Sequence, residues 1–325
     1  MSHYKIVFTD YYYPHIEQEK EILAKIGDVE IIDCTKVVSG GVKDEDQVLK
    51  YVSDADAIIV QFARISRKVI EGLENCRIIS RYAIGVDNID IEAASDKGIV
   101  VANVPDYCIE EVSDTAIAHI LNCVRKITLA NNLFHKGDWA YAKIKPIRRL
   151  EELTIGIIAF GNIARRVAEK LKPYGNTILV YDPYFQDKNA YPWVEFLSLE
   201  ELLSRSDVIS VHIPLNKDTY YLLDRDTLAF LKKGAIIVNT SRGGVIDEIA
   251  LAEAIEDGRI AAAGLDVLDY LDEEYAKSVL MKYPERVFIT PHMGWYSEEA
   301  IADLQRKTAL NVYEMFMNGK PLYQV

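Results

Sequence analysis

One segment of the chain has the residue types of a phosphate-binding turn. An apolar run, a glycine and an amphipathic stretch follow one another within residues 154–171, which is the order strand, turn, helix. The first N–H groups of a helix have no partner inside the helix, and they can bind a pyrophosphate. The dinucleotide-binding fingerprint has three glycines in such a turn. Here the three positions hold Ala159, Gly161 and Ala164.

The two alanines decide whether this turn can still bind a dinucleotide. Gly161 occupies the position where the backbone comes closest to the pyrophosphate, and a methyl group there would collide with the ligand. Ala164 occupies the position where helix and strand pack closely, and its methyl group costs about 1 kcal/mol. Ala159 lies at the tight turn, which alanine can form if its φ is negative. We therefore expect a tightened but intact site; the alternative is a crossover that binds nothing.

Asp182 favours NAD as the ligand of this turn. It follows Gly161 by 21 positions and ends the next apolar run, TILVY. A carboxylate at that place accepts hydrogen bonds from the ribose hydroxyls of NAD and would repel the extra phosphate of NADP. Strand, turn, helix and acidic residue in register form a more specific signal than a glycine turn alone.

The surrounding segments predict an α/β chain with two doubly wound parallel sheets. Short β-branched runs alternate with amphipathic stretches over the first hundred residues, and again in the middle of the chain. Strands that are apolar nearly throughout and separated by helices indicate parallel sheets covered on both faces. Ligands of such folds collect beyond the carboxyl ends of the strands, so we expect the chemistry in a crevice between two lobes.

Two long helical patterns join the predicted lobes. Residues 109–127 keep apolar residues at helical spacing for about five turns. The last helix begins at a plausible cap, Ser297, followed by Glu299, and its length suggests a return to the first lobe. We therefore expect one domain from residues 1–101 and 296–325, and a second domain from residues 102–295.

Composition excludes several classes of partner. The chain has 325 residues, of which 37 are Lys or Arg and 50 are Asp or Glu, so its formal net charge is −13. This charge repels nucleic acid and anionic lipid, and neither is an expected partner. The four cysteines lack metal-type spacing and are expected to be reduced, mostly buried thiols. Without an apolar run of about 18 residues or an export signal, the chain is expected to be cytoplasmic.

Six segments resemble, in order and spacing, the D-isomer-specific 2-hydroxyacid dehydrogenases. That family includes phosphoglycerate dehydrogenase, glyoxylate and hydroxypyruvate reductases, and the C-terminal binding proteins, to which ISRYAIGVDNID and PHMGWYSEEA are most similar. The resemblance implies a Rossmann NAD-binding domain (102–295) inserted in a flavodoxin-like substrate-binding domain. The segments are IGVDNIDIEAASDKGIVVANVP (84–105), AFGNIARRVA (159–168), VYDPY (180–184), VHIPLNKDT (211–219), KKGAIIVNTSRGGVIDEIALAEAIEDGRIAAAGLDV (232–267) and TPHMGWYSEEA (290–300).

The resemblance assigns roles to an arginine and a histidine. Reducing a 2-keto acid by hydride transfer requires a group that holds the carboxylate, a group that polarises the carbonyl and an acid that protonates the new alkoxide. Arg242, in NTSRGG, resembles the arginine whose planar fork clamps both oxygens. His292, in TPHMGW, matches the acid/base histidine, whose pKa suits proton transfer near neutral pH.

One catalytic position departs from the family. The family pairs its histidine with a glutamate five positions after the aspartate of the LDV motif, and counting from Asp266 this position holds Leu271. A one-residue bulge would bring Asp272 into place; the alternatives are a carboxylate from elsewhere or real loss of the group. Without a carboxylate, the protonated form of His292 loses stabilisation, and both rate and pH optimum should fall.

Further contacts follow from the same resemblance. The amides of Ile84 and Gly85 are expected to face the substrate carboxylate, Arg81 to point toward the substrate, and Trp295 to favour apolar or aromatic tails; Arg81 could instead be an ordinary charge at a strand end. The remaining histidines, His3, His15, His119 and His135, match no motif and are expected at the surface or in the core. Cofactor contacts are expected from Gly161, Asn162, Ile163, Asp182, His212, Pro214, Thr240, Ser241, Asp266 and Gly294.

These observations predict an NAD-dependent D-2-hydroxyacid dehydrogenase that reduces 2-keto acids. The helical stretch 109–127 and the following TLANNLFHKGDW resemble the family's dimer-forming arm, so a homodimer is expected. The alternative is an NAD(H)-responsive binding protein of the C-terminal binding protein type, with weak or lost catalysis, which Leu271 slightly favours. A formate-type or phosphite-type dehydrogenase is disfavoured, because Leu271 and Trp295 do not suit so small a substrate.

Overall fold

The computed structural model describes residues 3–139, 141–269 and 272–325, which form two compact units. Unit 1 contains the start of the chain up to Tyr107 and its end from Ser297, and unit 2 contains Cys108–Tyr296. Each unit is built on one all-parallel sheet, with five strands in unit 1 and seven in unit 2. This confirms the predicted fold class.

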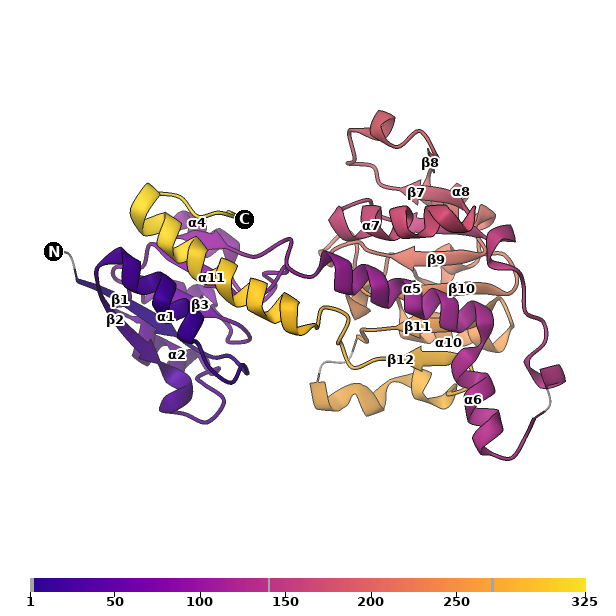
Figure 1. Cartoon of the computed structure of the whole chain (residues 1–325), viewed down its shortest axis with the longest axis horizontal. Coiled ribbons are helices and arrows are strands. Elements are labelled where there is room, and N and C mark those ends of the chain that lie inside the picture. The colour runs from indigo at the N-terminus through magenta and orange to yellow at the C-terminus, as the bar shows by residue number, and fades with distance from the viewer. Residues whose placement is uncertain (1–2, 140, 270–271) are drawn as a thin grey trace. The chain divides into compact units, whose positions relative to one another are not determined.

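Unit 1 has the strand order β2-β1-β3-β4-β5. Figure 1 labels its strands β1, β2 and β3 and its helices α1, α2, α4 and α11. Alternate residues of β1 pack on opposite faces: Ile6 and Phe8 contact the core under α1 and α11, and Val7 contacts the core under α2, α3 and α4. Its strands are β1 His3–Phe8, β2 Asp28–Asp33, β3 Ala57–Val60, β4 Ile78–Arg81 and β5 Val100–Ala102, and its helices are α1 Glu17–Leu23, α2 Glu45–Val52, α3 Arg67–Glu71, α4 Ile91–Asp96 and α11 Glu298–Asn318.

Unit 2 has the strand order β12-β11-β10-β9-β6-β7-β8. One core lies between the sheet and helices α5 and α7, and another lies under α8, α9 and α10. The strands are β6 Thr154–Ile158, β7 Thr177–Tyr181, β8 Val194–Phe196, β9 Val208–Val211, β10 Ala235–Asn239, β11 Ile260–Leu265 and β12 Val287–Ile289. The helices are α5 Ile109–Arg125, α6 Ile127–His135, α7 Asn162–Leu171, α8 Leu199–Arg205, α9 Arg225–Leu228 and α10 Glu248–Glu256.

The strand order of unit 2 reverses between β6 and β9. From β6 the chain moves outward through β7 and β8, then returns to the other side of β6 as β9. In open α/β sheets, ligands bind at the carboxyl ends of the two strands that flank such a reversal. The residues that follow β6 and β9 are the phosphate turn and His212.

Helix ends differ partly from the sequence prediction. The pattern at 109–127 is interrupted, because Lys126 adopts a left-handed φ of 55° and ends α5 at Arg125. The side chain of Asn122 then accepts hydrogen bonds from the amide and hydroxyl of Thr128, which redirects the chain into α6. The predicted cap of α11 is confirmed, since Ser297 Oγ accepts from the Ala300 amide at 2.9 Å.

Candidate active site

The carboxyl edge of the seven-stranded sheet collects most of the predicted site residues of unit 2. Gly161 follows β6, Asp182 follows β7 and His212 follows β9. On the other side of the reversal, Thr240, Ser241 and Arg242 follow β10, Asp266 follows β11 and His292 follows β12. All strands run in the same direction, so these side chains share one edge of the sheet.

The turn after β6 presents an uncapped helix N-terminus. Gly161 is the N-cap of α7, and no described side chain caps the first turn. A Cβ built on Gly161 meets none of the described atoms within 4 Å. The first N–H groups of a helix bind pyrophosphate, and the space at Gly161 leaves room for the ligand, so the turn fits the cofactor contacts predicted for Gly161, Asn162 and Ile163.

The backbone of Ala159 corrects one expectation. We expected alanine to form the turn with a negative φ, but its φ is +66°. Left-handed backbone costs a non-glycine residue about 1–2 kcal/mol. The turn therefore keeps the shape that glycine favours, and the surrounding structure must offset the strain.

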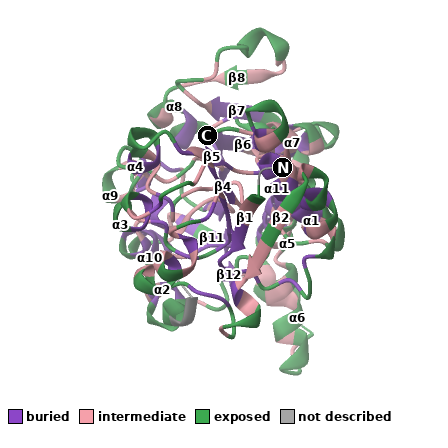
Figure 2. Cartoon of the chain, turned by 90° about the vertical axis from the view of Figure 1, so that its left-hand side faces the viewer, coloured by how far each residue is buried: buried purple, intermediate pink, exposed green. Residues whose placement is uncertain are grey.

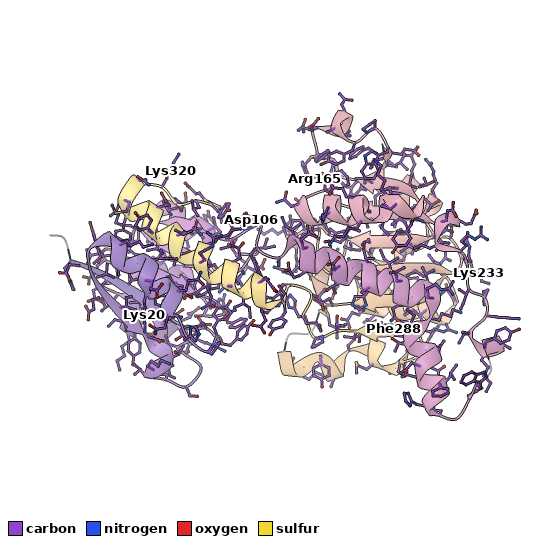
Figure 3. The ribbon with its side chains drawn as sticks, viewed as in Figure 1. Lys20, Asp106, Arg165, Lys233, Phe288 and Lys320 are labelled. Atoms are coloured by element: carbon purple, nitrogen blue, oxygen red, sulfur yellow. The ribbon has the colours of Figure 1, made fainter. Side chains whose placement is uncertain are left out.

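Two side chains hold this turn from outside. Asp182 accepts hydrogen bonds from the amide of Phe160 at 2.8 Å and from the amides of Tyr184 and Phe185. Arg165, in the first turn of α7 (Figure 3), donates to the Phe160 carbonyl at 3.1 Å and to the Asn162 side chain. The two Asp182 oxygens have about four acceptor positions, and the three amides occupy three of them, so the carboxylate retains one position for a ribose hydroxyl. Sequence reasoning missed Arg165, because no spacing rule marks it.

His212 is suited to lining the site rather than to proton transfer. Its Nε2 lies 2.8 Å from Ser210 Oγ. Burial lowers the pKa of the ring to about 4, because a charged imidazole is poorly solvated there. The ring is therefore neutral near pH 7. Pro214, two residues further on, uses its carbonyl oxygen to accept a hydrogen bond from Thr219.

The turn after β10 is organised by Asn239. Its side chain donates to the Arg242 carbonyl at 2.9 Å and accepts from the amide and hydroxyl of Ser241. Gly243 lies against the backbone of Leu268, where a Cβ would clash. Thr240 Oγ1 is buried and has no hydrogen-bond partner among the described residues. An orphaned buried hydroxyl fits the predicted contact with the nicotinamide side of the cofactor.

Asp266 is buried and binds the turn that carries His292. Its Oδ1 accepts from Thr290 Oγ1 at 2.5 Å and from the Met293 amide at 3.0 Å, and its Oδ2 accepts from the Gly294 amide at 2.8 Å. A Cβ on Gly294 would lie 2.7 Å from Asp266 Oδ2, so glycine permits this approach. The carboxylate thus fixes the backbone on the C-terminal side of His292.

His292 itself has a left-handed backbone, with a φ of 51°. Its amide donates to the Thr290 carbonyl at 2.9 Å, and its own carbonyl accepts from Trp295 Nε1 at 2.9 Å. Such strained residues persist only where their surroundings hold them. Leu271 lies outside the described residues, and Asp272 is described only as the first residue of a 3₁₀ helix, Asp272–Lys277. Their relation to His292 stays a prediction.

The predicted substrate residues of unit 1 lie at the carboxyl edge of its own sheet. Arg81 ends β4; its Nε donates to the Gln61 carbonyl at 3.3 Å, and its Nη1 lies 3.9 Å from an Asp87 oxygen. In the loop that follows, the Ile84 carbonyl accepts from Asn103 Nδ2 at 2.6 Å. Gly85 is half-buried beside it.

Sequence reasoning also missed His119. We expected a surface or core residue, and the ring is indeed buried, with 6% of its area exposed. However, its Nε2 lies 3.0 Å from Thr290 Oγ1, so it connects to the His292 turn. The only sequence signal is a histidine on an otherwise apolar helix face.

Comparisons with known proteins show which family the chain resembles. The family model for the NAD binding domain of D-isomer specific 2-hydroxyacid dehydrogenases matches residues 117–294. A D-3-phosphoglycerate dehydrogenase of Methanocaldococcus jannaschii is 38% identical over 299 residues, which are 91% of this chain and 54% of that protein. A hydroxypyruvate reductase of Thermotoga maritima is 36% identical over 275 residues, 83% of this chain and 87% of that protein. The chain thus spans about half the length of the phosphoglycerate dehydrogenases that it matches.

Solved structures show the same fold. A glyoxylate reductase from Paecilomyes thermophila has a TM-score of 0.88 and 25% identity, covering 100% of this chain and 99% of that one. A D-lactate dehydrogenase from Aquifex aeolicus, solved with NAD and lactic acid, has a TM-score of 0.83 and 26% identity, covering 98% of both chains.

The fold, the phosphate turn after β6 and the similarity to known proteins identify the chain as an oxidoreductase with an NAD-binding domain. More particularly, the chain belongs to the D-isomer specific 2-hydroxyacid dehydrogenase family. Within the described residues, no helix has the length and apolar character needed to cross a membrane.

Proposed function

We propose that the protein reduces 2-keto acids to D-2-hydroxy acids with NADH. The observation that carries this proposal is the shared carboxyl edge of unit 2, where the uncapped phosphate turn, Arg242 and His292 follow β6, β10 and β12. Bound NADH supplies the hydride that reduces the carbonyl carbon. Relatives named hydroxypyruvate reductase and glyoxylate reductase act on acids of this class.

Each residue has a defined task in this proposal. The guanidinium of Arg242 binds the substrate carboxylate and carbonyl oxygen as a planar fork. His292 donates a proton to the carbonyl oxygen as negative charge develops there. A carboxylate, for which Asp272 is our candidate, stabilises the protonated ring. In unit 1, Arg81 and the amides of Ile84 and Gly85 are proposed substrate contacts, and the Trp295 ring is proposed to favour apolar or aromatic tails.

We further propose a homodimer and a cytoplasmic location. All residues of α6 are described and none is buried, so α6 carries only the green and pink of exposed and intermediate residues in Figure 2. Two of them, Ile127 and Phe134, are apolar and exposed. Trp139, just beyond α6, has 84% of its area exposed. An apolar surface of this kind supports a second copy of the chain as its partner.

The proposed cytoplasmic location rests on the four free thiols, of which three are buried.

The test is NADH oxidation with glyoxylate, hydroxypyruvate, pyruvate, and branched and aromatic 2-keto acids. We expect turnover with at least one acid, and a loss of about 100-fold or more in kcat in Arg242→Gln and His292→Gln. Both variants should bind NADH by calorimetry with wild-type affinity. No turnover with any acid but tight NADH binding would support the NAD(H)-responsive binding protein, to which the loss of the family glutamate at Leu271 points. No heat on adding NADH would refute both proposals.

A further inference from the structure

A buried histidine that the proposed chemistry does not use lies behind the His292 turn. His119 is on α5, and its Nε2 is 3.0 Å from Thr290 Oγ1. Its ring packs against β11 at Gly264, where a Cβ would lie 2.8–3.0 Å from the Cβ, Nδ1 and Cγ of His119. A side chain at position 264 would therefore displace the imidazole. The absence of that side chain makes room for the histidine.

The direction of the hydrogen bonds follows from the number of available protons. Thr290 Oγ1 has one hydrogen, and it lies 2.5 Å from Asp266 Oδ1, a carboxylate oxygen that also accepts from the Met293 amide. The threonine oxygen must therefore accept from His119, so Nε2 carries the proton. Burial lowers the pKa of His119, and the opposing influence of Asp266 on that pKa is smaller. The neutral ring with Nε2–H thus donates to Thr290, and Thr290 donates to Asp266.

The hydrogen-bond network reaches the backbone beside His292. Asp266 accepts from the amides of Met293 and Gly294, the two residues that follow His292. His292 has a φ of 51°, which the adjacent backbone must hold in place. We propose that His119 is a positioning residue, which orients Thr290 and Asp266 and thereby holds the backbone that presents His292. This inference rests on the proposed role of His292 in catalysis.

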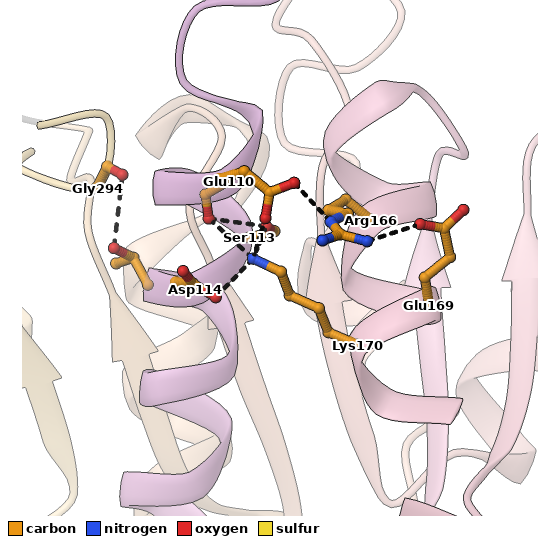
Figure 4. A network of polar contacts seen from close by, with 8 residues as sticks. Glu110, Ser113, Asp114, Arg166, Glu169, Lys170 and Gly294 are labelled. Atoms are coloured by element: carbon orange, nitrogen blue, oxygen red, sulfur yellow. Dashed lines mark hydrogen bonds and ion pairs between the residues drawn. The ribbon is translucent and has the colours of Figure 1, made fainter. Parts of the chain in front are cut away.

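Helix α5 also contacts both the turn that carries His292 and α7, the helix that begins at the phosphate turn. Thr115 Oγ1, one turn before His119, lies 3.5 Å from the Gly294 carbonyl (Figure 4). On a neighbouring face of α5, Lys170 of α7 binds Ser113 Oγ at 2.8 Å and Asp114 at 2.6 Å. Arg166 of α7 binds Glu110 at 2.7 Å. One helix therefore contacts both the element that begins at the phosphate turn and the turn that carries His292.

Two pairs of variants test the proposal. His119→Met removes the donor at similar volume, and His119→Gln keeps an N–H near the position of Nε2. Thr290→Val removes the hydroxyl, and Thr290→Ser keeps it. In His119→Met and Thr290→Val we expect kcat to fall about 10-fold to 100-fold, because the backbone that presents His292 is no longer held in place, while the Kd for NADH changes by less than kcat. His119→Gln and Thr290→Ser should recover most of kcat.

A second readout does not depend on turnover. Without NADH, hydrogen exchange of the Met293 and Gly294 amides should accelerate about 10-fold or more in His119→Met and Thr290→Val, and return toward the wild-type rate in the two conservative variants. The kcat of the double variant, His119→Met with Thr290→Val, should be little lower than that of either single variant, because both substitutions break the same chain of hydrogen bonds. Wild-type exchange rates and kcat in His119→Met would overturn the inference. If the exchange rates change but the wild type reduces no 2-keto acid, the positioning holds and the proposed function fails.

Discussion

Ala159 shows how a single residue can retain a glycine-like turn. Its φ of +66° lies at the point where β6 leads into α7. Asp182 accepts hydrogen bonds from three backbone amides, and Arg165 donates one to the Phe160 carbonyl. These hydrogen bonds hold the backbone around Ala159. The strain is thus local, and the contacts around it are specific.

Replacing Ala159 by glycine should therefore stabilise the protein. Removing the left-handed penalty of about 1–2 kcal/mol outweighs the extra freedom of glycine in the unfolded chain, so the free energy of unfolding should rise by about 0.5 kcal/mol in urea titrations. Ala168→Gly is the control: Ala168 lies in α7 and is fully buried, and the variant should lose about 1–2 kcal/mol. A destabilised Ala159→Gly would contradict the assigned strain.

His212 and His119 make stability depend on pH. The pKa of each is below 6.5 in the folded protein, about 4 for His212. Above pH 6.5 both states are neutral; below it the unfolded chain binds protons that the folded protein does not. Stability therefore falls between pH 6.5 and about 4, by at most about 3 kcal/mol for His212.

Urea titrations of the wild type and His212→Gln over this interval measure the effect. The variant should lose less stability than the wild type as the pH falls, because glutamine does not titrate. Equal slopes in the two proteins would show that His212 is not protected from protonation.

At the scale of elements, NADH binding and stability depend on different glycines of the β6-turn-α7 unit. Gly161 has a φ of −70°, which any residue adopts, and its missing side chain faces open space among the described atoms. Gly161→Ala should keep the wild-type free energy of unfolding to within about 0.5 kcal/mol. Its Kd for NADH should rise about 100-fold, because the methyl group occupies the space of the pyrophosphate.

Gly156, in β6, gives the opposite result and serves as the control. A Cβ there would clash with Ser206 Oγ and lie 2.7 Å from Leu202 Cδ2. Gly156→Ala should lose about 1–3 kcal/mol of stability but bind NADH normally while folded. Wild-type NADH affinity in Gly161→Ala, measured by calorimetry, would rule out the phosphate turn as the cofactor site.

At the scale of the whole molecule, the exposed apolar residues around α6 predict dimerisation. The wild type should sediment at twice the chain mass of 36.8 kDa. Phe134→Glu combined with Trp139→Glu should give monomers, because charges buried in an apolar interface lack partners. Tyr184→Glu, also in unit 2 and at a position 82% exposed, should leave the dimer intact. A monomeric wild type would refute the proposed interface.

The sequence by itself determined the local features: the phosphate turn with Asp182 in register, the parallel α/β class and the cap at Ser297. Each depends on neighbouring residues, through hydrophobic periodicity, capping or the spacing of a short motif. The motif around His292 could also be recognised from the sequence, because it directly follows a strand.

Only the tertiary structure decided which side chains hold these motifs in place. The φ of Ala159 depends on how the turn is held, and the interruption at Lys126 depends on the side chain of Asn122. His119 and Thr290 are 171 residues apart, and they meet because α5 packs over β11 at a glycine. Contacts between distant segments are set by the packing of helices on the sheet, which no local pattern of residues encodes.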